Sequence, residues 1–469
     1  MTLLTATAEQ STAVPMGTTL FFAAVLVAMI VCLAFEEILH AKKSLIVGMF
    51  AMVTLLLGAW LLPMPFDPVL VVLPDGHNVR IPVFISAIDW GVIGIILGSS
   101  LFVDVIARSG LFSWIAIRLT KASRGDPAKL LWIYGVMTVI FSAVLNNVTA
   151  MIIVGSLTVV SLRKLRRDEL LLGFLLIEGL LTNVGGLLTL ISSVPNIIVG
   201  TTAGISFVEF FIKAGPYVVV ATAATIWLGG RIFGVRPLQS THERDQAAFL
   251  VSGFDENDSI ESRGFFWFSA VMLVCFILTI ATTSVLPFVH ELGMAFVALS
   301  YAAVMLIRYK HEVNTFYRAI DWDLLGFFAA LFAVISVMEH AEVLALIGRG
   351  LEQLIALGDV AGPGAILVAA AAASSVTDNI PLAAMLAKIL AALDTPGDSI
   401  LWWAVIFGAN LGGNITPIGS ASTLVAVTII HKHGLHLSFA GFVAKALVFA
   451  LMQLAIALVY VLFVLPMFG

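Results

Sequence analysis

The sequence SAVLNNVT at residues 142–149 decides the fold, because a related sequence, SSVTDNIP, occurs at residues 374–381. Each interrupts a long apolar segment with a polar pair, Asn146-Asn147 in the first and Asp378-Asn379 in the second. Polar side chains and irregular backbone are tolerated inside a membrane only where protein or water satisfies their hydrogen bonds. Two such interruptions in related sequences therefore point to a duplicated membrane structure.

The composition supports a membrane protein. Of the 469 residues, 60% are hydrophobic and 11% are charged, whereas ordinary soluble domains carry about 25% charged residues. Several apolar runs approach the roughly 20 residues that a helix needs to cross the hydrocarbon core. We predict membrane spans near residues 17–38, 45–62, 83–107, 169–202, 215–235, 263–286, 293–308, 322–340, 400–430 and 440–466.

A second pair of related sequences is rich in glycine: NVGGLLTLISS at residues 183–193 and NLGGNITPIGS at residues 410–420. Their shared residues are Asn, Gly, Thr and Ser in one order, which chance similarity between apolar helices does not explain. We therefore infer an internal repeat. The first copy covers residues 1–235, with a helix break at 183–196; the second covers 263–469, with a break at 410–423, and a polar linker, 236–262, joins them.

The basic residues set the expected topology. If residues 130–161 crossed the membrane once, the sequence RKLRR at 163–167 would lie opposite the basic residues of 118–129, against the positive-inside rule. We therefore interpret 130–161, and by analogy 363–391, as re-entrant hairpins. Five spans and one hairpin per copy give an odd number of crossings, so the second copy is inverted.

The predicted fold is thus an all-α polytopic membrane protein made of two inverted repeats. We expect a bacterial inner (plasma) membrane location, both termini outside and the linker in the cytoplasm. We also expect short helices along the membrane surface at 111–121 and 207–214. This orientation places outside only four of the 24 Lys and Arg residues: Arg80, Lys213, Arg349 and Lys388.

We predict a binding site where the hairpin tips meet the helix breaks. Glycine lets the backbone unwind and approach a ligand, and half-helix N-termini suit an anion. Paired broken helices in inverted repeats are the best sequence pointer to a transporter's site. The expected substrate-binding residues are the polar residues of the tips and of the ends of the breaks: Asn146, Asn147, Thr149, Asp378, Asn379, Ser193, Asn196, Ser420 and Thr423.

Freed carbonyls with Asn and Thr oxygens can also hold a desolvated Na⁺. A carboxylate at a hairpin tip is costly and usually functional, so Asp378 is a candidate cation ligand or proton carrier, the alternative being a pair with Lys388. Glu178 is either a proton-relay group or a buried hydrogen-bonded residue, and tight helix packing is the alternative for the Gly-Gly pairs. The expected cation-coupling residues are Asn183, Gly185, Gly186, Thr189, Asn410, Gly412, Gly413, Thr416, Asp378 and Glu178.

These motifs resemble the ion transporter superfamily, and within it the branch of arsenite permeases, NhaD-type antiporters and P proteins, related to the divalent anion–sodium symporters. SAVLNNVTAMI and SSVTDNIPLAAM look like that branch's paired hairpin motifs, and GANLGGNITPIGSASTLVAV is similar to its second break. The first break reads SSVPN at 192–196, where the branch usually carries Gly-Asp-Pro-Pro-Asn. The resemblance implies a scaffold domain, a moving transport domain, an elevator mechanism and commonly a homodimer.

The predicted function is secondary active transport of a small anion or oxyanion, coupled to Na⁺ or H⁺. The alternatives are a Na⁺/H⁺ antiporter that carries only cations, an ion channel that uses the broken helices as a filter, and a receptor. The sequence contains neither a phosphate-binding P-loop nor an HExxH motif, so nothing indicates a pump or a metalloprotease. We expect no enzyme activity, no cofactor besides the coupling ion and no nucleic-acid partner.

Overall fold

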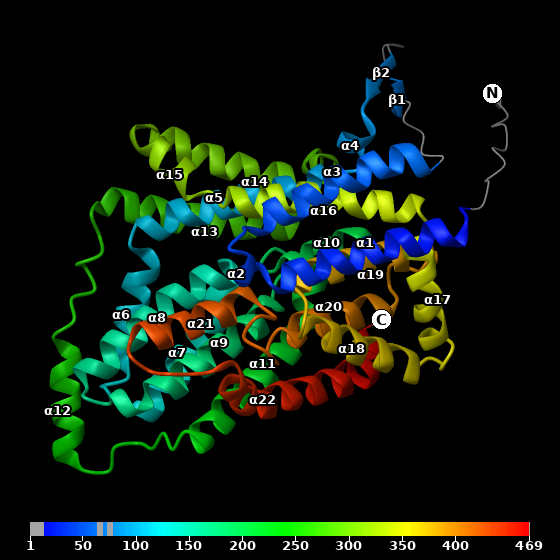
Figure 1. Ribbon diagram of the computed structural model, residues 1–469. Helices are drawn as coiled ribbons and strands as arrows, with labels where there is room; N and C mark the ends of the chain where they lie inside the picture. Colours follow the sequence, from blue (N-terminus) through cyan, green and yellow to red (C-terminus); the bar gives the residue numbers. More distant parts are fainter. Residues whose placement is uncertain (1–13, 63–68, 73–77, 469) are drawn as a thin grey trace. The chain divides into compact units, whose positions relative to one another are not determined.

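The computed structural model describes residues 14–62, 69–72 and 78–468, and nearly all of its regular structure is helical (Figure 1). Within these residues, 11 helices are long and apolar enough to cross a membrane, which confirms the predicted all-α polytopic membrane class. Two compact units form from non-contiguous segments: Met1–Asp89 with Asp323–Gly350, and Trp90–Trp322 with Leu351–Gly469.

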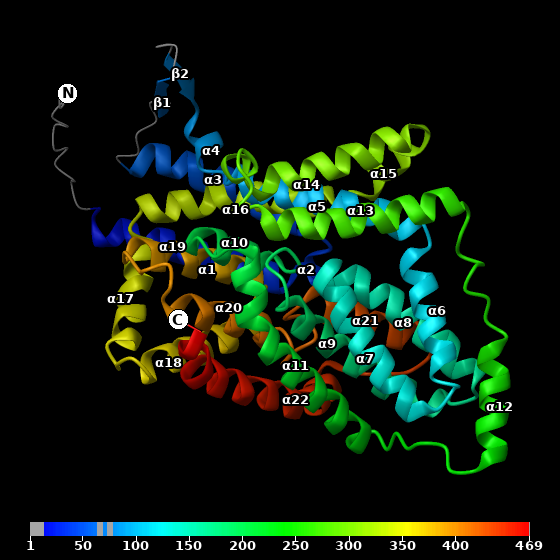
Figure 2. The same ribbon diagram turned by 180° about the vertical axis from the view of Figure 1, so that it is seen from behind.

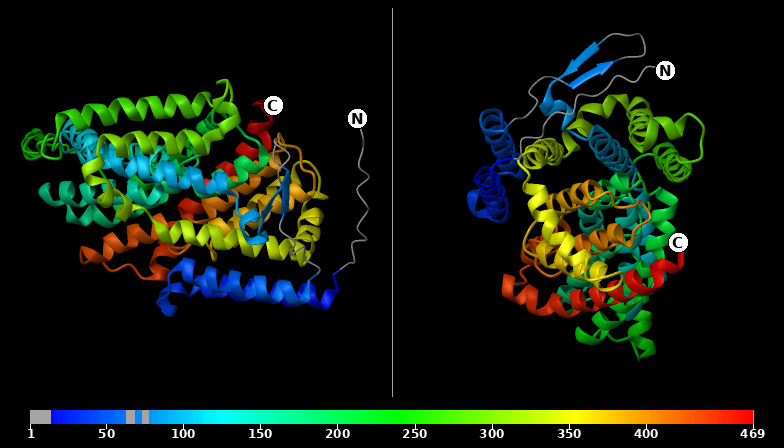
Figure 3. Two further views of the ribbon diagram at one scale, coloured as in Figure 1. Left: turned by 90° about the horizontal axis from the view of Figure 1, so that it is seen from above. Right: turned by 90° about the vertical axis from the view of Figure 1, so that its right-hand side faces the viewer.

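The first unit is a small group of helices with one β-hairpin. Ser44 and Asp323, whose side chains form a hydrogen bond, join α3 to α16. Strands β1 and β2 pair antiparallel, with Val69 opposite Ile81 (Figure 3). The sequence analysis predicted no strand here. The described elements are α1 (Met16–Ala34), α2 (Glu36–Leu39), α3 (Lys43–Leu61), β1 (Val69–Val72), β2 (Asn78–Ile81), α4 (Val83–Ser86) and α16 (Trp322–His340).

The second unit holds the predicted hairpins and breaks. Its elements are α5 (Trp90–Arg108), α6 (Leu111–Ala122), α7 (Pro127–Val144), α8 (Asn147–Lys164), α9 (Leu171–Gly186), α10 (Val194–Ala203), α11 (Phe207–Ile232), α12 (Thr241–Ser252), α13 (Arg263–Thr282), α14 (Val289–Arg308), α15 (Val313–Ala319), α18 (Ala361–Ser374), α19 (Asn379–Ala392), α20 (Ile400–Gly412), α21 (Ala421–Lys432) and α22 (Phe439–Val459). Helix α17 (Val343–Ile355) contributes residues to both units.

Both predicted hairpins are helix pairs that turn at the expected polar residues. Helices α7 and α8 have 18 residues each, and α18 and α19 have 14 each. At 1.5 Å per residue, 18 residues extend about 27 Å, so the first pair is long enough to approach the far side of a membrane. A helix pair returns the chain to the side that it came from. The basic residues before α7 and after α8 therefore lie at the same end of this helix pair.

Both predicted breaks divide a span into two helices. The span predicted at 169–202 forms α9 and α10, with residues 187–193 between them, and the span at 400–430 forms α20 and α21, with residues 413–420 between them. Each second half-helix packs against the hairpin of the other half of the chain, α10 against α19 and α21 against α8 (Figures 1 and 2).

Three local predictions differ from the structure. The short helix expected at 207–214 is the first part of the continuous 26-residue helix α11, which contains Pro216. Proline inside a membrane helix is tolerated where neighbouring groups satisfy the freed carbonyl. The span expected at 83–107 begins with the separate one-turn helix α4, and the linker 236–262 contains helix α12. The short helix expected at 111–121 is confirmed as α6.

Glycine permits a close helix crossing in the second unit, between α5 and α14. A Cβ atom on Gly98 would lie 2.5 Å from the backbone of Ala298 and Leu299, and one on Gly94 would lie 3.1 Å from Ala295. Small residues four apart let two membrane helices approach until their backbones touch. Larger side chains at these positions would push α5 and α14 apart.

Candidate functional site

Each hairpin tip is an N-cap. The Asn146 Oδ1 atom accepts a hydrogen bond from the Thr149 amide at 2.7 Å and caps α8. The Asp378 Oδ1 atom accepts from the Ile380 amide at 3.1 Å and caps α19. Asn and Asp are among the preferred N-cap residues, so these two side chains have a structural role that the sequence analysis did not consider. Asn146 is exposed and Asp378 is half-buried.

Asn147, the first residue of α8, connects the first tip to the first broken helix. Its Oδ1 atom accepts from the Ser142 hydroxyl at 2.6 Å, and its Nδ2 atom donates to Asn183 Oδ1 at 3.3 Å. A Cβ atom on Gly186 would lie 2.8 Å from the Asn147 amide group. The matched residue Asn379 begins α19 and is half-buried.

The two breaks are joined to each other by reciprocal hydrogen bonds. Ser193 Oγ donates to Asn410 Oδ1 at 2.7 Å, and its counterpart Ser420 Oγ donates to Asn183 Oδ1 at 2.9 Å. Asn410 Nδ2 also donates to Asn196 Oδ1 at 2.8 Å. All five side chains are buried. The structure thus brings together residues that are more than two hundred positions apart in the sequence.

Each break is also fastened to its own hairpin at matched positions. Thr189 Oγ1 donates to the Ala143 carbonyl at 2.6 Å, and Thr416 Oγ1 donates to the Ser375 carbonyl at 2.5 Å. A second matched pair of bonds connects the hairpin serines to the broken helices: Ser142 Oγ to the Thr182 carbonyl at 2.7 Å and Ser374 Oγ to the Ala409 carbonyl at 2.6 Å.

The glycine pairs lie at the ends of α9 and α20. A Cβ atom on Gly185 would lie 2.6 Å from the Val139 carbonyl oxygen, and one on Gly412 would lie 2.3 Å from the Ala371 carbonyl oxygen. These two glycines therefore permit close packing of α9 on α7 and of α20 on α18. Gly186 ends α9 and Gly413 follows α20, so the irregular backbone begins directly after each pair.

The half-helices α10 and α21 begin without a side-chain cap. Ser193 and Ser420 hold their N-cap positions, but neither hydroxyl accepts from a backbone amide of its own helix, because each is bonded to an asparagine of the other break. The first amide groups of a helix have no partner within the helix and carry partial positive charge. The site therefore contains two buried helix N-termini whose amide groups lack a side-chain cap.

A polar cluster behind the breaks was missed by the sequence analysis. Asn414 Oδ1 accepts from Asn183 Nδ2 at 2.8 Å, and Asn414 Nδ2 donates to Gln453 Oε1 at 2.8 Å. Gln453 Nε2 continues to Thr225 Oγ1 at 3.0 Å, and Thr182 Oγ1 donates to Ser422 Oγ at 2.8 Å. Gln453, a single amide in the apolar sequence of α22, was the signal that could have found this cluster.

Glu178 is fully buried in α9. Its Oε1 atom accepts from Thr158 Oγ1 at 2.5 Å, whereas its Oε2 atom has no hydrogen-bond partner among the described residues. Buried carboxyl groups of this kind inside a membrane protein are functional candidates by default. The structure does not bring Glu178 into the hydrogen-bonded set of the breaks; it lies one turn before Thr182 and Asn183 on the same helix.

The tips and breaks contain no basic side chain. Residues 142–149, 183–196, 374–381 and 410–423 include neither Lys nor Arg. Positive potential at this site must therefore come from the helix N-termini or from a bound cation.

Two broken helices that pack against two helix hairpins, with buried polar side chains at the breaks, are the arrangement that defines this chain as a membrane transporter. The chain matches the family described as "Citrate transporter" (CitMHS) over residues 30–408. It belongs to this family, within the ion transporter superfamily that the motifs indicated.

Curated relatives agree with this assignment. An uncharacterized transporter of Mycobacterium bovis is 30% identical over 380 residues, which cover 80% of this chain and 86% of the relative. The P protein of Mus musculus is 25% identical over 450 residues, which cover 80% of this chain and 54% of that protein. The crystal structure of the Alcanivorax borkumensis YdaH transporter shares the fold, with a TM-score of 0.54 at 14% identity over 90% of this chain and 98% of that one.

Proposed function

We propose that this transporter moves a small anion or oxyanion across the membrane and couples its movement to Na⁺ or H⁺. The observation that carries the proposal is the pair of uncapped helix N-termini at α10 and α21. Backbone amides at a helix N-terminus form a ready anion site, because the N–H groups and the helix dipole both favour negative charge. In this proposal the polar residues of the tips, including Asn147 and Asn379, complete the anion site.

The missing basic side chains support cation coupling. An anion that enters a site without Lys or Arg is neutralised only by helix ends, each worth roughly half an elementary charge. A multiply charged anion therefore needs an accompanying cation. The family description makes citrate, a tricarboxylate, the first substrate to test.

We propose the second break as the preferred cation site, because the carbonyls of the first break are occupied. The Gly186 carbonyl accepts from Ser192 Oγ at 2.6 Å and from Asn196 Nδ2 at 2.6 Å. The Thr189 carbonyl accepts from the same two side chains at 2.8 and 3.0 Å. Ser192 shares its single hydroxyl hydrogen between the two carbonyls, and Asn196 donates to both, so both carbonyl oxygens already have hydrogen-bond donors.

The matched carbonyls of the second break have no side-chain donor among the described residues. Gly419 and Thr423 replace the serine and asparagine, and Thr423 Oγ1 bonds instead to the carbonyls of Pro417 and Ser420. The Gly413 carbonyl is thus available to a cation. The Thr416 carbonyl accepts from the Gly419 amide at 3.3 Å and keeps its second lone pair for a cation. Such an ion needs several oxygens at about 2.3–2.6 Å if it behaves like Ca²⁺.

Proton coupling is the second candidate, and Glu178 favours it. An unpaired carboxyl oxygen in a fully buried position suits a group that takes up and releases a proton during transport. With Asp378 as a second carrier at the tip, the same scaffold would also support a Na⁺/H⁺ antiporter, and a continuous pathway through the breaks would make it a channel.

The proposal includes inverted repeats, an elevator mechanism and a homodimer. The matched hydrogen bonds of the two halves support inverted repeats at 1–235 and 263–469 about the linker 236–262. In an elevator mechanism the hairpins and broken helices would move together, since these bonds fasten each break to its own hairpin. Family resemblance supports a homodimer.

The test is uptake of labelled citrate and of a panel of small oxyanions into vesicles that contain the purified protein. Saturable uptake that depends on an imposed Na⁺ or pH gradient supports a coupled carrier. Uptake that rises linearly with concentration, with no dependence on either gradient, would favour a channel. Na⁺-driven proton movement without any anion requirement would favour the antiporter.

A further inference from the structure

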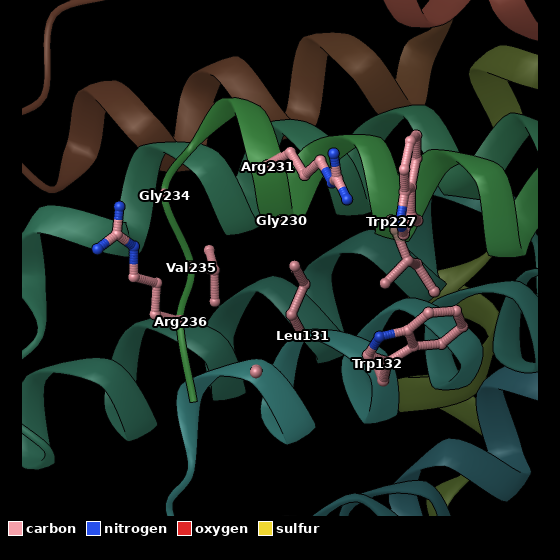
Figure 4. A pocket seen from close by; sticks show the side chains of 10 residues that line it. Leu131, Trp132, Trp227, Gly230, Arg231, Gly234, Val235 and Arg236 are labelled. Carbon is pink, nitrogen blue, oxygen red and sulfur yellow. The ribbon is translucent and has the colours of Figure 1, made fainter. Parts of the chain in front are cut away.

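A cavity of about 470 Å³ lies away from the breaks, between the start of α7 and the end of α11. Figure 4 shows Trp132 and Trp227 at one end, Arg236 at the other, and Leu131 and Val235 between them. Arg231 of α11 also lines the cavity, and its side chain extends toward Trp227. We call this the arginine cavity.

Asp126 fixes the relative position of the two backbone segments that line the arginine cavity. The Oδ1 atom of this buried carboxylate accepts from the amides of Ala128 and Lys129 at 3.0 and 3.1 Å and caps α7. Its Oδ2 atom accepts from the Leu238 amide at 2.9 Å. The segment after α11 is therefore fastened beside the first turn of α7, and Arg236 is kept at the rim of the cavity.

The two arginines are available to an anion. In the part of the chain that the structure describes, neither guanidinium forms an ion pair with a carboxylate. The Arg231 guanidinium lies 4.5 Å from the centroid of the Trp227 ring. Stacking on an indole restrains a guanidinium while its N–H groups stay available as donors.

We propose that the arginine cavity binds the phosphate of an anionic lipid headgroup. Arginine donors in a planar fork match phosphate oxygens. The indole rings of Trp132 and Trp227 are exposed near the start of α7 and the end of α11, and tryptophan is enriched at such helix ends beside lipid headgroups. Basic pockets between membrane helices bind anionic headgroups. The tryptophans and Leu131 favour a phosphate that carries acyl chains over a free phosphate ion.

The experiment compares the thermal unfolding of the purified full chain in detergent with added phosphatidylglycerol, cardiolipin, phosphatidylcholine or inorganic phosphate. The two anionic lipids should raise the unfolding temperature, and phosphatidylcholine and inorganic phosphate should not. The double variant Arg231→Gln with Arg236→Gln should raise the concentration of anionic lipid needed for half-maximal stabilisation by about tenfold or more. Arg263→Gln, at the exposed start of α13, removes a positive charge elsewhere and should leave the effect unchanged.

Three outcomes would overturn the proposal. Equal stabilisation of wild type and double variant by anionic lipid would remove the arginines from the site. An equal loss in Arg263→Gln would reduce the effect to general surface charge. Stabilisation by inorganic phosphate as strong as by lipid would assign the cavity to a soluble phosphate. If the double variant does not fold, Arg231→Lys with Arg236→Lys carries the test, because lysine keeps the charge but loses the planar fork; the discrimination between anionic lipid and phosphatidylcholine should still fall.

Discussion

The two halves of the candidate site share a backbone plan but differ in how many of their polar groups are already bonded. In the first half, Ser192 and Asn196 fill the carbonyls of the break, and Asn147 bonds to two neighbouring side chains. In the second half, Gly419 and Thr423 occupy the positions that match Ser192 and Asn196. No hydrogen bond of the Asn379 side chain is found among the described residues. The carbonyls of the first break thus accept from side chains, whereas the matched carbonyls of the second break have no side-chain donor among the described residues.

This difference shows how a duplicated structure can divide two tasks. The reciprocal bonds from Ser193 and Ser420 to the facing asparagines keep the two breaks together. The second break has Thr423 where the first has Asn196, so its matched carbonyls lack the donor that Asn196 provides. Satisfied buried networks hold one geometry. We therefore expect mutations in the first half to affect stability, and mutations in the second half to affect ligand and ion binding.

The largest effect on stability is expected from Asn196→Ala. It removes one of the two side-chain donors to each of the Gly186 and Thr189 carbonyls, and it removes an acceptor of Asn410 Nδ2. Each lost hydrogen bond costs about 1 kcal/mol net, so the loss of these bonds should lower the free energy of unfolding by about 3 kcal/mol. The matched control, Thr423→Val, loses only bonds to nearby carbonyls and should cost about 1 kcal/mol. Equal losses in chemical unfolding would refute the distinction between the halves.

Asn147→Ala and Asn379→Ala test the two tips. Both variants should abolish transport while expression persists, because each removes a donor and an acceptor from the proposed anion site. Asn147→Ala should also lower the free energy of unfolding by about 1 kcal/mol, because it breaks the bonds to Ser142 and Asn183, whereas Asn379→Ala should not. Uptake and unfolding are measured on the same preparations. Wild-type uptake in either variant would make that tip structural.

The sequence predicted the framework of the fold well and the details of the site less completely. Spans, helix pairs and breaks follow from apolar runs and from polar or glycine interruptions, which are local signals. The partners of Asn414 are not local: its bonds reach Gln453 on α22 and Asn183 on α9, and only the packing of distant helices reveals them. The hairpin of β1 and β2 was missed because its four-residue strands are too short to give a clear alternating pattern.

A moderate effect on the ion dependence of uptake is expected from threonine variants in the two breaks. If Na⁺ is used, Thr416→Val should raise the Na⁺ concentration for half-maximal uptake by about tenfold, equivalent to about 1.4 kcal/mol. Thr189→Val should raise it less, because the first break is already closed by side chains. If H⁺ is used, both should be mild, and Glu178→Gln or Asp378→Asn should remove the pH dependence of uptake. No change in any of the four variants would exclude coupling at this site.

The smallest effect on transport is expected from cysteines in exposed connections, which test whether the halves are inverted. Glu169 follows α8, and Asp398 follows α19. Ser252 lies in the linker. The linker contacts the end of α8, where Lys164 Nζ lies 3.9 Å from the centroid of the Phe254 ring. It also contacts the end of α6 through an ion pair of Lys121 with Glu256. Leu165 is a poorer site, because its side chain is buried.

Under the inverted arrangement, Glu169→Cys and Ser252→Cys should react with an impermeant thiol reagent only after the cells are permeabilised. Asp398→Cys should react in intact cells, because the matched connection of an inverted repeat emerges on the opposite side. Cysteines 32 and 275 must first be replaced, since Cys275 is exposed. Reaction of all three positions from one side would refute the inversion while leaving the matched hydrogen bonds in place. Reaction of the first two from outside, with Asp398→Cys protected, would keep the inversion and reverse the orientation that the positive-inside rule predicts.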